Sequence, residues 1–128
     1  MQRKIKFRGK DIATEKWVYG YLYRFKGVYT ICENIRYTEE VPILLDTVGQ
    51  YTGLKDKNGK EIYEGDIVQA VFADEEEPET KGVVVYVEAG ACYMVIANNG
   101  DEWDLGYLDK IEKIGNKWDN PELLEEGE

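Results

Sequence analysis

The sequence contains no histidine and no serine, although it is 128 residues long. Histidine is the usual general base, the commonest metal ligand and the side chain that titrates near neutral pH. Serine is the nucleophile of triad-type hydrolases. The two absences exclude serine-based hydrolysis and every site that depends on an imidazole.

Long apolar runs are also absent, and cysteine is scarce. No run approaches the roughly 20 apolar residues of a membrane-spanning helix, and the charged residues that follow Met1 are unlike a signal peptide. We therefore expect a cytoplasmic protein with no membrane partner. Cys32 and Cys92 lie in the apolar runs VYTIC and ACYMVIA, which favours two buried free thiols over a disulfide.

Charge is distributed unevenly along the chain. Residues 1–36 hold nine Lys/Arg and three acids, a net charge of +6, so the remaining residues carry −16 of the total of −10. Three interpretations fit this asymmetry. The two parts attract each other within one fold or between subunits, the acidic part mimics or repels nucleic acid, or the acids simply keep the surface soluble.

Short apolar and aromatic runs separated by turn residues predict an all-β fold. Hydrophobic residues make up 43% of the chain, and its ten tyrosines suit strands better than helices. Strands are expected at 4–8, 17–23, 28–32, one or two within 35–45, 67–72, 82–87, 92–97, 103–107 and about 111–114. The pattern predicts a mainly β, antiparallel small barrel or sandwich of about eight to ten short strands.

The organisation expected along the chain has three parts. Residues 1–47 form a basic, aromatic β subdomain, residues 48–118 a hairpin block and an acidic barrel-like subdomain, and residues 119–128 a short helix or tail. Asn120 followed by Pro121 predicts the start of that helix, because asparagine caps helices and proline suits the first helical position. Asp46-Thr47 is compatible with a single helical turn.

The block from Val48 to Val68 is rich in turn glycines. Asn58-Gly59 predicts a hairpin with a type I′ turn, which needs positive φ at both positions. Lys55, Asp56 and Lys57 are expected to face water on its arm, as a recognition tip or simply as solubilising residues. With Tyr51 and Tyr63 they form one candidate interaction surface.

A second candidate surface is basic and lies near the N-terminus. Lys4, Lys6 and Arg8 alternate along one expected strand and are predicted to point outward. Tyrosines and a tryptophan follow at residues 17–23, and aromatic, basic β surfaces bind single-stranded nucleic acids. The charge of −16 elsewhere opposes phosphate binding, so tyrosines in the core and a basic edge docked on an acidic neighbour are the simpler interpretation.

No residue set predicts a catalytic, metal or cofactor site. The acidic runs 74–77 and 101–104 lack calcium-loop spacing, so solvated loops are favoured over cation sites. Glu64 with Asp66, or Glu102 with Asp104, are the pairs that glycoside chemistry would need, and nothing else in the sequence supports it. The glycines match no phosphate-binding spacing. We expect a non-enzymatic protein with no cofactor.

The chain resembles the YopX family of phage and prophage proteins. The resemblance rests on Ile5–Arg8, Trp17–Gly20, the central segments 48–56 and 59–68, and the ends 114–116 and 120–124. It implies a predominantly β fold, no established activity, no catalytic residues to transfer, and a bacterial cytoplasmic setting during phage growth. It departs from the family mainly in the acidic 73–81 segment.

Three functional hypotheses follow. The first is a protein that binds proteins, including copies of itself as a homo-oligomer or an unidentified phage or host protein. The second is a nucleic-acid-associated factor that uses the basic N-terminal face. The third is an acidic nucleic-acid mimic that inhibits a host enzyme.

Overall fold

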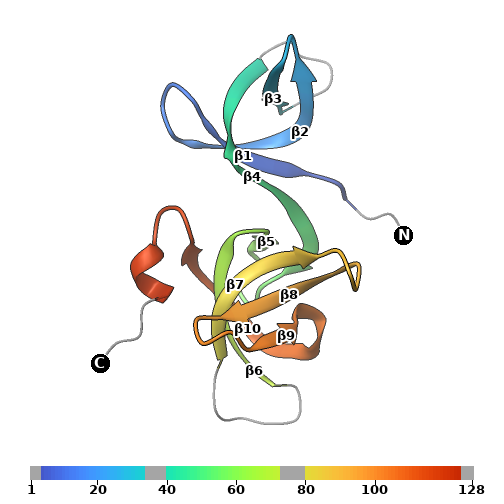
Figure 1. Cartoon of the computed structure of the whole chain (residues 1–128), viewed down its shortest axis with the longest axis vertical. Coiled ribbons are helices and arrows are strands. Elements are labelled where there is room, and N and C mark those ends of the chain that lie inside the picture. The colour runs from blue at the N-terminus through green and yellow to red at the C-terminus, as the bar shows by residue number, and fades with distance from the viewer. Residues whose placement is uncertain (1–3, 34–39, 73–79, 125–128) are drawn as a thin grey trace. The chain divides into compact units, whose positions relative to one another are not determined.

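The computed structural model describes residues 4–33, 40–72 and 80–124, and nearly all of them lie in or between β-strands (Figure 1). Two antiparallel five-stranded sheets are formed within these residues. The strands are β1 (Phe7–Asp11), β2 (Trp17–Phe25), β3 (Val28–Cys32), β4 (Glu40–Lys55), β5 (Glu61–Tyr63), β6 (Asp66–Phe72), β7 (Thr80–Val87), β8 (Cys92–Ala97), β9 (Glu102–Asp104) and β10 (Leu108–Asn116). The predicted fold class and strand number are confirmed.

The chain divides into two compact units, residues 1–53 and 54–128, and the division falls within β4. This strand is 16 residues long and also contains the boundary at residues 47 and 48 that the sequence suggested. The helical turn considered at Asp46-Thr47 is wrong. The Thr47 hydroxyl accepts from the Lys10 N–H at 2.8 Å and donates to the Leu44 carbonyl at 2.6 Å, so it satisfies backbone groups where the β1–β4 register shifts.

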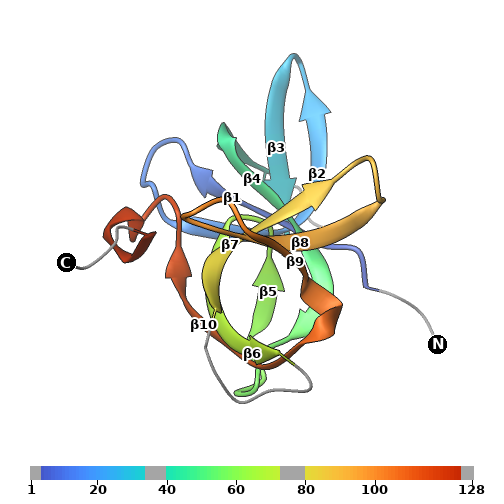
Figure 2. The same cartoon turned by 60° about the horizontal axis from the view of Figure 1, so that its bottom comes forward.

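In the first unit, β1 to β4 pair in a closed ring. β2 lies between β1 and β3, β3 pairs with β4, and β4 pairs back with β1 (Figure 2). β2 pairs with β1 as far as Gly20 and with β3 from Tyr21 onward. A Cβ on Gly20 would lie 2.4 Å from the Cys32 carbonyl oxygen. Only glycine allows the backbone approach that lets one strand serve two neighbours.

Ile31, Cys32 and Ile43 are buried in the first unit. Gly9 brings β1 close to them, because its Cβ would lie 2.8 Å from the Ile43 Cδ1. Cys32 is a buried free thiol, and Cys92 in the second unit is free and half-buried. The prediction of free cysteines is confirmed, although Cys92 is less buried than expected.

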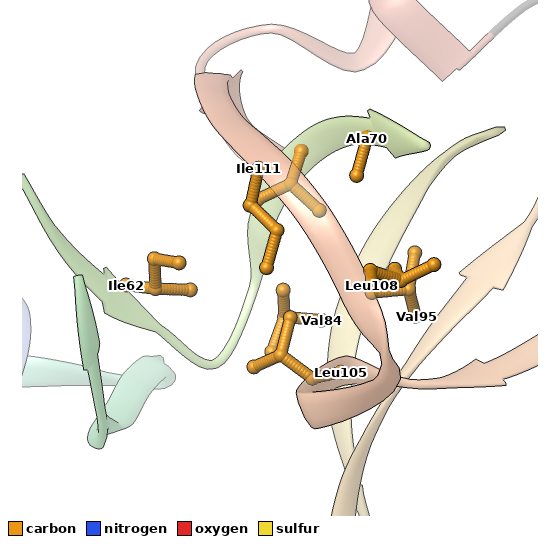
Figure 3. Packing of buried hydrophobic residues seen from close by; sticks show 8 residues of the cluster. Ile62, Ala70, Val84, Val95, Leu105, Leu108 and Ile111 are labelled. Carbon is orange, nitrogen blue, oxygen red and sulfur yellow. The ribbon is translucent and has the colours of Figure 1, made fainter. Parts of the chain in front are cut away.

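In the second unit, one sheet has the order β10-β6-β7-β8-β9. Its core is a single aliphatic cluster contributed by four of these strands, β5 and the short turn after β9 (Figure 3). The buried members are Ile62, Val68, Ala70, Val84, Val95, Leu105, Leu108 and Ile111. The spacing by two of Val68 with Ala70 is the strand period, and it explains why one face of β6 faces the core.

Three predicted elements differ from the structure. Lys4 to Lys6 precede β1 instead of opening it. β7 was expected to be buried on both faces, but Tyr86 is exposed and Val83 and Val85 are only half-buried. The expected strand at 103–107 is β9 followed by a 3-10 turn, Leu105–Tyr107, because the Asp104 carboxylate accepts from the Gly106 N–H and caps it.

The predicted C-terminal helix is wrong. Pro121–Leu124 form only a 3-10 turn. The Asn120 side chain, which was expected to cap a helix, turns back and accepts from the Asn116 N–H at 3.2 Å. A capping asparagine would instead accept from N–H groups that follow it in the chain, so no helix is started.

Candidate interaction surfaces

The loop at residues 56–60 joins β4 to β5, as predicted, but its turn type differs. The Gly59 N–H donates to the Asp56 carbonyl at 2.9 Å, and the Asp56 N–H donates to the Lys60 carbonyl at 2.7 Å. Gly59 has a φ of 85°, whereas Asn58 is not among the residues with positive φ. The type I′ prediction is therefore wrong, because a three-residue loop with one glycine in the left-handed region closes this hairpin.

Asp56 is buried and holds this loop together. Its Oδ1 accepts from the backbone N–H groups of Asn58 at 2.8 Å and Lys60 at 2.9 Å, and its Oδ2 accepts from the N–H of Lys113 in β10 at 2.9 Å. Burial by itself raises the pKa of the Asp56 carboxyl. The hydrogen bonds from the N–H groups of Lys113, Lys60 and Asn58, together with the Lys60 charge, have the larger combined effect, so the pKa lies below its ordinary value. The expectation that Asp56 faces water is wrong.

Lys55 and Lys57, the two flanking lysines, are exposed as expected and line an open cleft of about 360 Å³. The other lining residues are Asp56, Leu108, Asp109, Lys110 and Ile111. The Lys57 N–H donates to the Ile111 carbonyl at 2.8 Å, which fixes the loop against β10. The structure thus adds Lys110, fifty or more positions away in sequence, to the predicted lysine pair.

Tyr63 belongs to the interior and not to a surface. It is 1% exposed, and its hydroxyl donates to the Glu61 carboxylate at 3.0 Å. Its backbone N–H donates to the fully buried carboxylate of Asp66 at 2.7 Å, and the Lys113 ammonium pairs with that same carboxylate at 3.2 Å. Asp66, one acid of the Glu64 and Asp66 pair named from the sequence, is thus held in the interior by these partners.

Lys4 and Lys6 line a cleft of about 230 Å³ in the first unit, together with Ile5, Gly20, Tyr21 and Glu33. Lys4 is exposed and Lys6 half-buried. The Lys6 ammonium lies 5.9 Å from the centre of the Tyr51 ring, and the Tyr51 N–H donates to the Lys6 carbonyl. Tyr51 itself is only 7% exposed, so its contacts with Lys6 hold this basic segment against the interior of the unit.

Arg8 does not join the basic face. Its side chain is 1% exposed, and its guanidinium carbon lies 4.4 Å from the centre of the Trp17 ring. The Lys10 ammonium lies 5.4 Å from the same ring. The prediction that Arg8 points outward is wrong, because its side chain is buried against the Trp17 ring.

The structure has an exposed aromatic face on β2, one of the two alternatives that the sequence left open for residues 17–23. Tyr19, Tyr21, Tyr23 and Phe25 follow one another at every second position, and Val28 of β3 lies opposite Phe25. Tyr19, Tyr21, Phe25 and Val28 are between 40% and 51% exposed. Of the eleven exposed large hydrophobic residues in the described parts of the chain, eight lie in the first unit. The simpler interpretation, which placed these tyrosines in the core, is therefore wrong for Tyr19 and Tyr21.

The acidic runs do not form a cation site where the structure describes them. The Asp101 carboxylate accepts a hydrogen bond from the side-chain amide of Asn99 in the same turn. The Asp104 carboxylate caps a 3-10 turn by accepting from the Gly106 N–H. Across residues 4–33, 40–72 and 80–124, no group of three or more Cys, Asp or Glu side chains is arranged to hold a metal ion. Residues 74–77 lie outside the described residues. None of the helical turns described is long and apolar enough to cross a membrane.

These features define an all-β protein of two small units whose described residues include an exposed aromatic face and open clefts edged by lysines. The chain belongs to the YopX family: the model of the YopX protein family matches residues 6–125.

A solved structure has a similar fold. It is the crystal structure of protein EF1440 from Enterococcus faecalis, with a TM-score of 0.50 and 23% sequence identity. The similarity covers 97% of this chain and 100% of that one. At this identity the likeness concerns the fold alone. Among curated proteins there is no match.

Proposed function

We propose that this chain is a non-enzymatic protein-binding factor that self-associates through the aromatic β2 face of its first unit. One observation carries the proposal: most of the exposed large hydrophobic residues in the described chain lie in residues 1–53. Apolar side chains that gather on one surface mark contacts with other proteins. Tyrosine and phenylalanine are also the residue types enriched at the centre of such contacts.

Charge supports association between copies. Residues 1–53 carry nine Lys/Arg and six acids, whereas residues 54–128 carry seven Lys/Arg and twenty acids. A positive unit and a strongly negative unit in the same chain favour contact between unlike surfaces of neighbouring copies. Such head-to-tail contacts give closed rings or open chains of subunits. We propose that the protein acts in the cytoplasm of a bacterium that carries a phage or prophage, a setting that membership of the YopX family supports.

Sedimentation velocity of the full chain tests the proposal at low and high salt over micromolar concentrations. We expect a concentration-dependent oligomer that Tyr21→Glu shifts toward the monomer. Tyr107→Glu is the matched control, because Tyr107 is 54% exposed in the second unit and Tyr21 is 51% exposed in the first. A strict monomer under all conditions, or equal effects of the two variants, would overturn the proposal.

Binding of single-stranded nucleic acid is the second candidate function. The observation that favours it is the cleft where Lys4 and Lys6 flank the exposed Tyr21 ring, since cations for phosphates and a ring for stacking are what such sites combine. The loss of Arg8 to the interior and the acidic second unit oppose it. A labelled oligothymidine titrated near 50 mM salt decides the matter: salt-sensitive binding abolished by Tyr21→Ala favours it, and no binding excludes it.

A further inference from the structure

The cleft between the 56–60 loop and the start of β10 is cationic, although it lies in the acidic half of the chain. Residues 54–128 contain seven Lys/Arg against twenty acids. Three of those seven, Lys55, Lys57 and Lys110, are exposed and line this single cleft. Lys55 and Lys57 flank Asp56 where the chain leaves β4, and Lys110 comes from β10 on the other side of the cleft.

Two acids, Asp56 and Asp109, also line the cleft, so its lining carries three positive and two negative charges. Both oxygens of Asp56 face the interior, where they accept from three backbone N–H groups. One oxygen of Asp109 accepts from the N–H of Lys110. Glu112 reaches Lys57 at 3.5 Å, but both side chains are well exposed to water, where such pairs contribute little.

The backbone at Lys110 is held in a conformation that a lysine does not favour. Its φ is 50°, and it lies where the pairing of β10 with β6 shifts register between Asp109 and Glu112. Glycine or asparagine would occupy this left-handed position with less strain. Glu15, Lys26 and Ala91 have similar φ values, so the conformation alone does not mark a site. At Lys110 it places the lysine side chain at the rim of the cleft.

The floor of the cleft is apolar. Leu108 and Ile111 line it and are 8% and 9% exposed, as part of the core of this unit. Lysine ammonium groups around an aliphatic floor match a ligand that has carboxylates and a small apolar side chain close together. A long polyanion fits less well, because beyond the cleft it meets a unit with a large negative charge.

We propose that this cleft binds a short acidic peptide segment of a partner protein, with its carboxylates on Lys55, Lys57 and Lys110 and an apolar side chain over Leu108 and Ile111. The site is separate from the aromatic face of the first unit. The proposal for this cleft therefore does not depend on self-association.

Fluorescence anisotropy of the full chain with a labelled Glu-Leu-Glu-Leu-Glu peptide tests the proposal. We expect saturable binding that rising salt weakens, and no binding of the matched Gln-Leu-Gln-Leu-Gln peptide. Each lysine replaced by alanine should weaken binding about 1.5- to 5-fold. Lys81→Glu, which changes an exposed lysine outside the cleft, should leave the affinity unchanged.

Lys110→Gly separates binding from folding. Because glycine relieves the positive φ, the variant should unfold at the same temperature as the parent or higher, yet bind the peptide less tightly by about 1.5- to 5-fold. Amide shifts in a nitrogen–proton spectrum should cluster at residues 55–57 and 108–111. Shifts confined to residues 4–33 would overturn the proposal, as would equal binding by Lys110→Gly.

Two competitors identify the occupant. An oligothymidine that displaces the probe more strongly than an unlabelled acidic peptide would make the cleft a polyanion patch and overturn the assignment. A peptide with residues 120–128 of this chain also combines leucines with acids. If this peptide displaced the probe most strongly, the occupant would be a second copy of the chain, and the assignment to a partner protein would be overturned. If neither the oligothymidine nor the 120–128 peptide displaces the labelled probe, but the unlabelled probe does, the result supports a partner protein as the occupant.

Discussion

The Asp56 carboxylate accepts a hydrogen bond at 2.9 Å from the backbone N–H of Lys113, a residue 57 positions later in the chain. The same carboxylate closes its own loop through Asn58 and Lys60. One buried side chain therefore shapes the hairpin and attaches it to β10. The lysines beside it owe their positions in the cleft to this anchor.

Replacing Asp56 should destabilise the protein strongly. Asp56→Ala leaves three backbone donors without their carboxylate, and we expect a loss of about 3 kcal/mol in the free energy of unfolding, measured with urea. Asp56→Asn keeps one acceptor oxygen and should lose roughly half as much. Glu88→Ala removes an exposed acid and should change stability by less than about 0.5 kcal/mol. Equal effects of Asp56→Ala and Glu88→Ala would contradict the anchor role.

Stability should also depend on pH through Asp56. The pKa of its carboxyl is lowered in the folded state from an ordinary value of 3.8. A lowered pKa means that the stabilising contribution is present above 3.8 and is lost as pH falls through the folded pKa. The difference in unfolding free energy between the parent and Asp56→Asn should be constant between about pH 5 and 7 and shrink below about pH 4. A difference that stays constant in acid would show that the carboxyl charge is unimportant.

Local patterns in the sequence predicted much of the fold and little of the surfaces. Val28–Cys32 and Cys92–Ala97 are strands with the predicted bounds, because β-branched and aromatic runs bounded by turn residues are a strand signal that the local sequence carries. Asp56 and Arg8 are charged, and charge normally means exposure. Their burial depends on partners in other strands, the N–H of Lys113 in β10 for Asp56 and the ring of Trp17 in β2 for Arg8.

The clefts were even less accessible to sequence reasoning. Lys110 joins Lys55 and Lys57 through the 56–60 loop and a register shift in β10, and no periodicity in the chain indicates that shift. The aromatic face is a different kind of error. Alternation identified Tyr19 and Tyr21 as sharing one side of a strand, but alternation cannot say which side faces water.

Gly65 and Gly59 should respond differently to alanine. Both have positive φ, 92° and 85°, so both substitutions carry the backbone cost of about 1 kcal/mol. A Cβ on Gly59 meets nothing within 4 Å, whereas one on Gly65 would lie 2.3 Å from the Trp118 ring. Gly65→Ala should therefore cost about 2 kcal/mol more than Gly59→Ala in urea unfolding, because the ring must move.

The environment of Trp118 provides a second measurement for Gly65→Ala. Displacement of the ring should shift the tryptophan emission of the folded protein, whereas Gly59→Ala should leave the emission unchanged. Equal unfolding free energies and equal spectra for the two variants would show that Trp118 does not pack against Gly65.

Arg8 should behave as a core residue. Its side chain is 1% exposed and lies 4.4 Å from the Trp17 ring centre, so Arg8→Ala removes both packing and a cation–π contact. We expect a loss of about 2 to 4 kcal/mol in unfolding free energy. Arg8→Lys should recover only part of it, because an ammonium cannot stack as a planar guanidinium does.

Arg24→Ala is the control for Arg8. Arg24 is exposed on β2 and lies 5.7 Å from the Tyr29 ring centre, so its loss should cost less than about 1 kcal/mol. The pair also separates structural from binding roles, because a surface cation used for nucleic acid would change affinity without changing stability. If Arg8→Ala unfolded like the parent protein and lost only oligothymidine binding, Arg8 would belong to a nucleic-acid surface and not to the core.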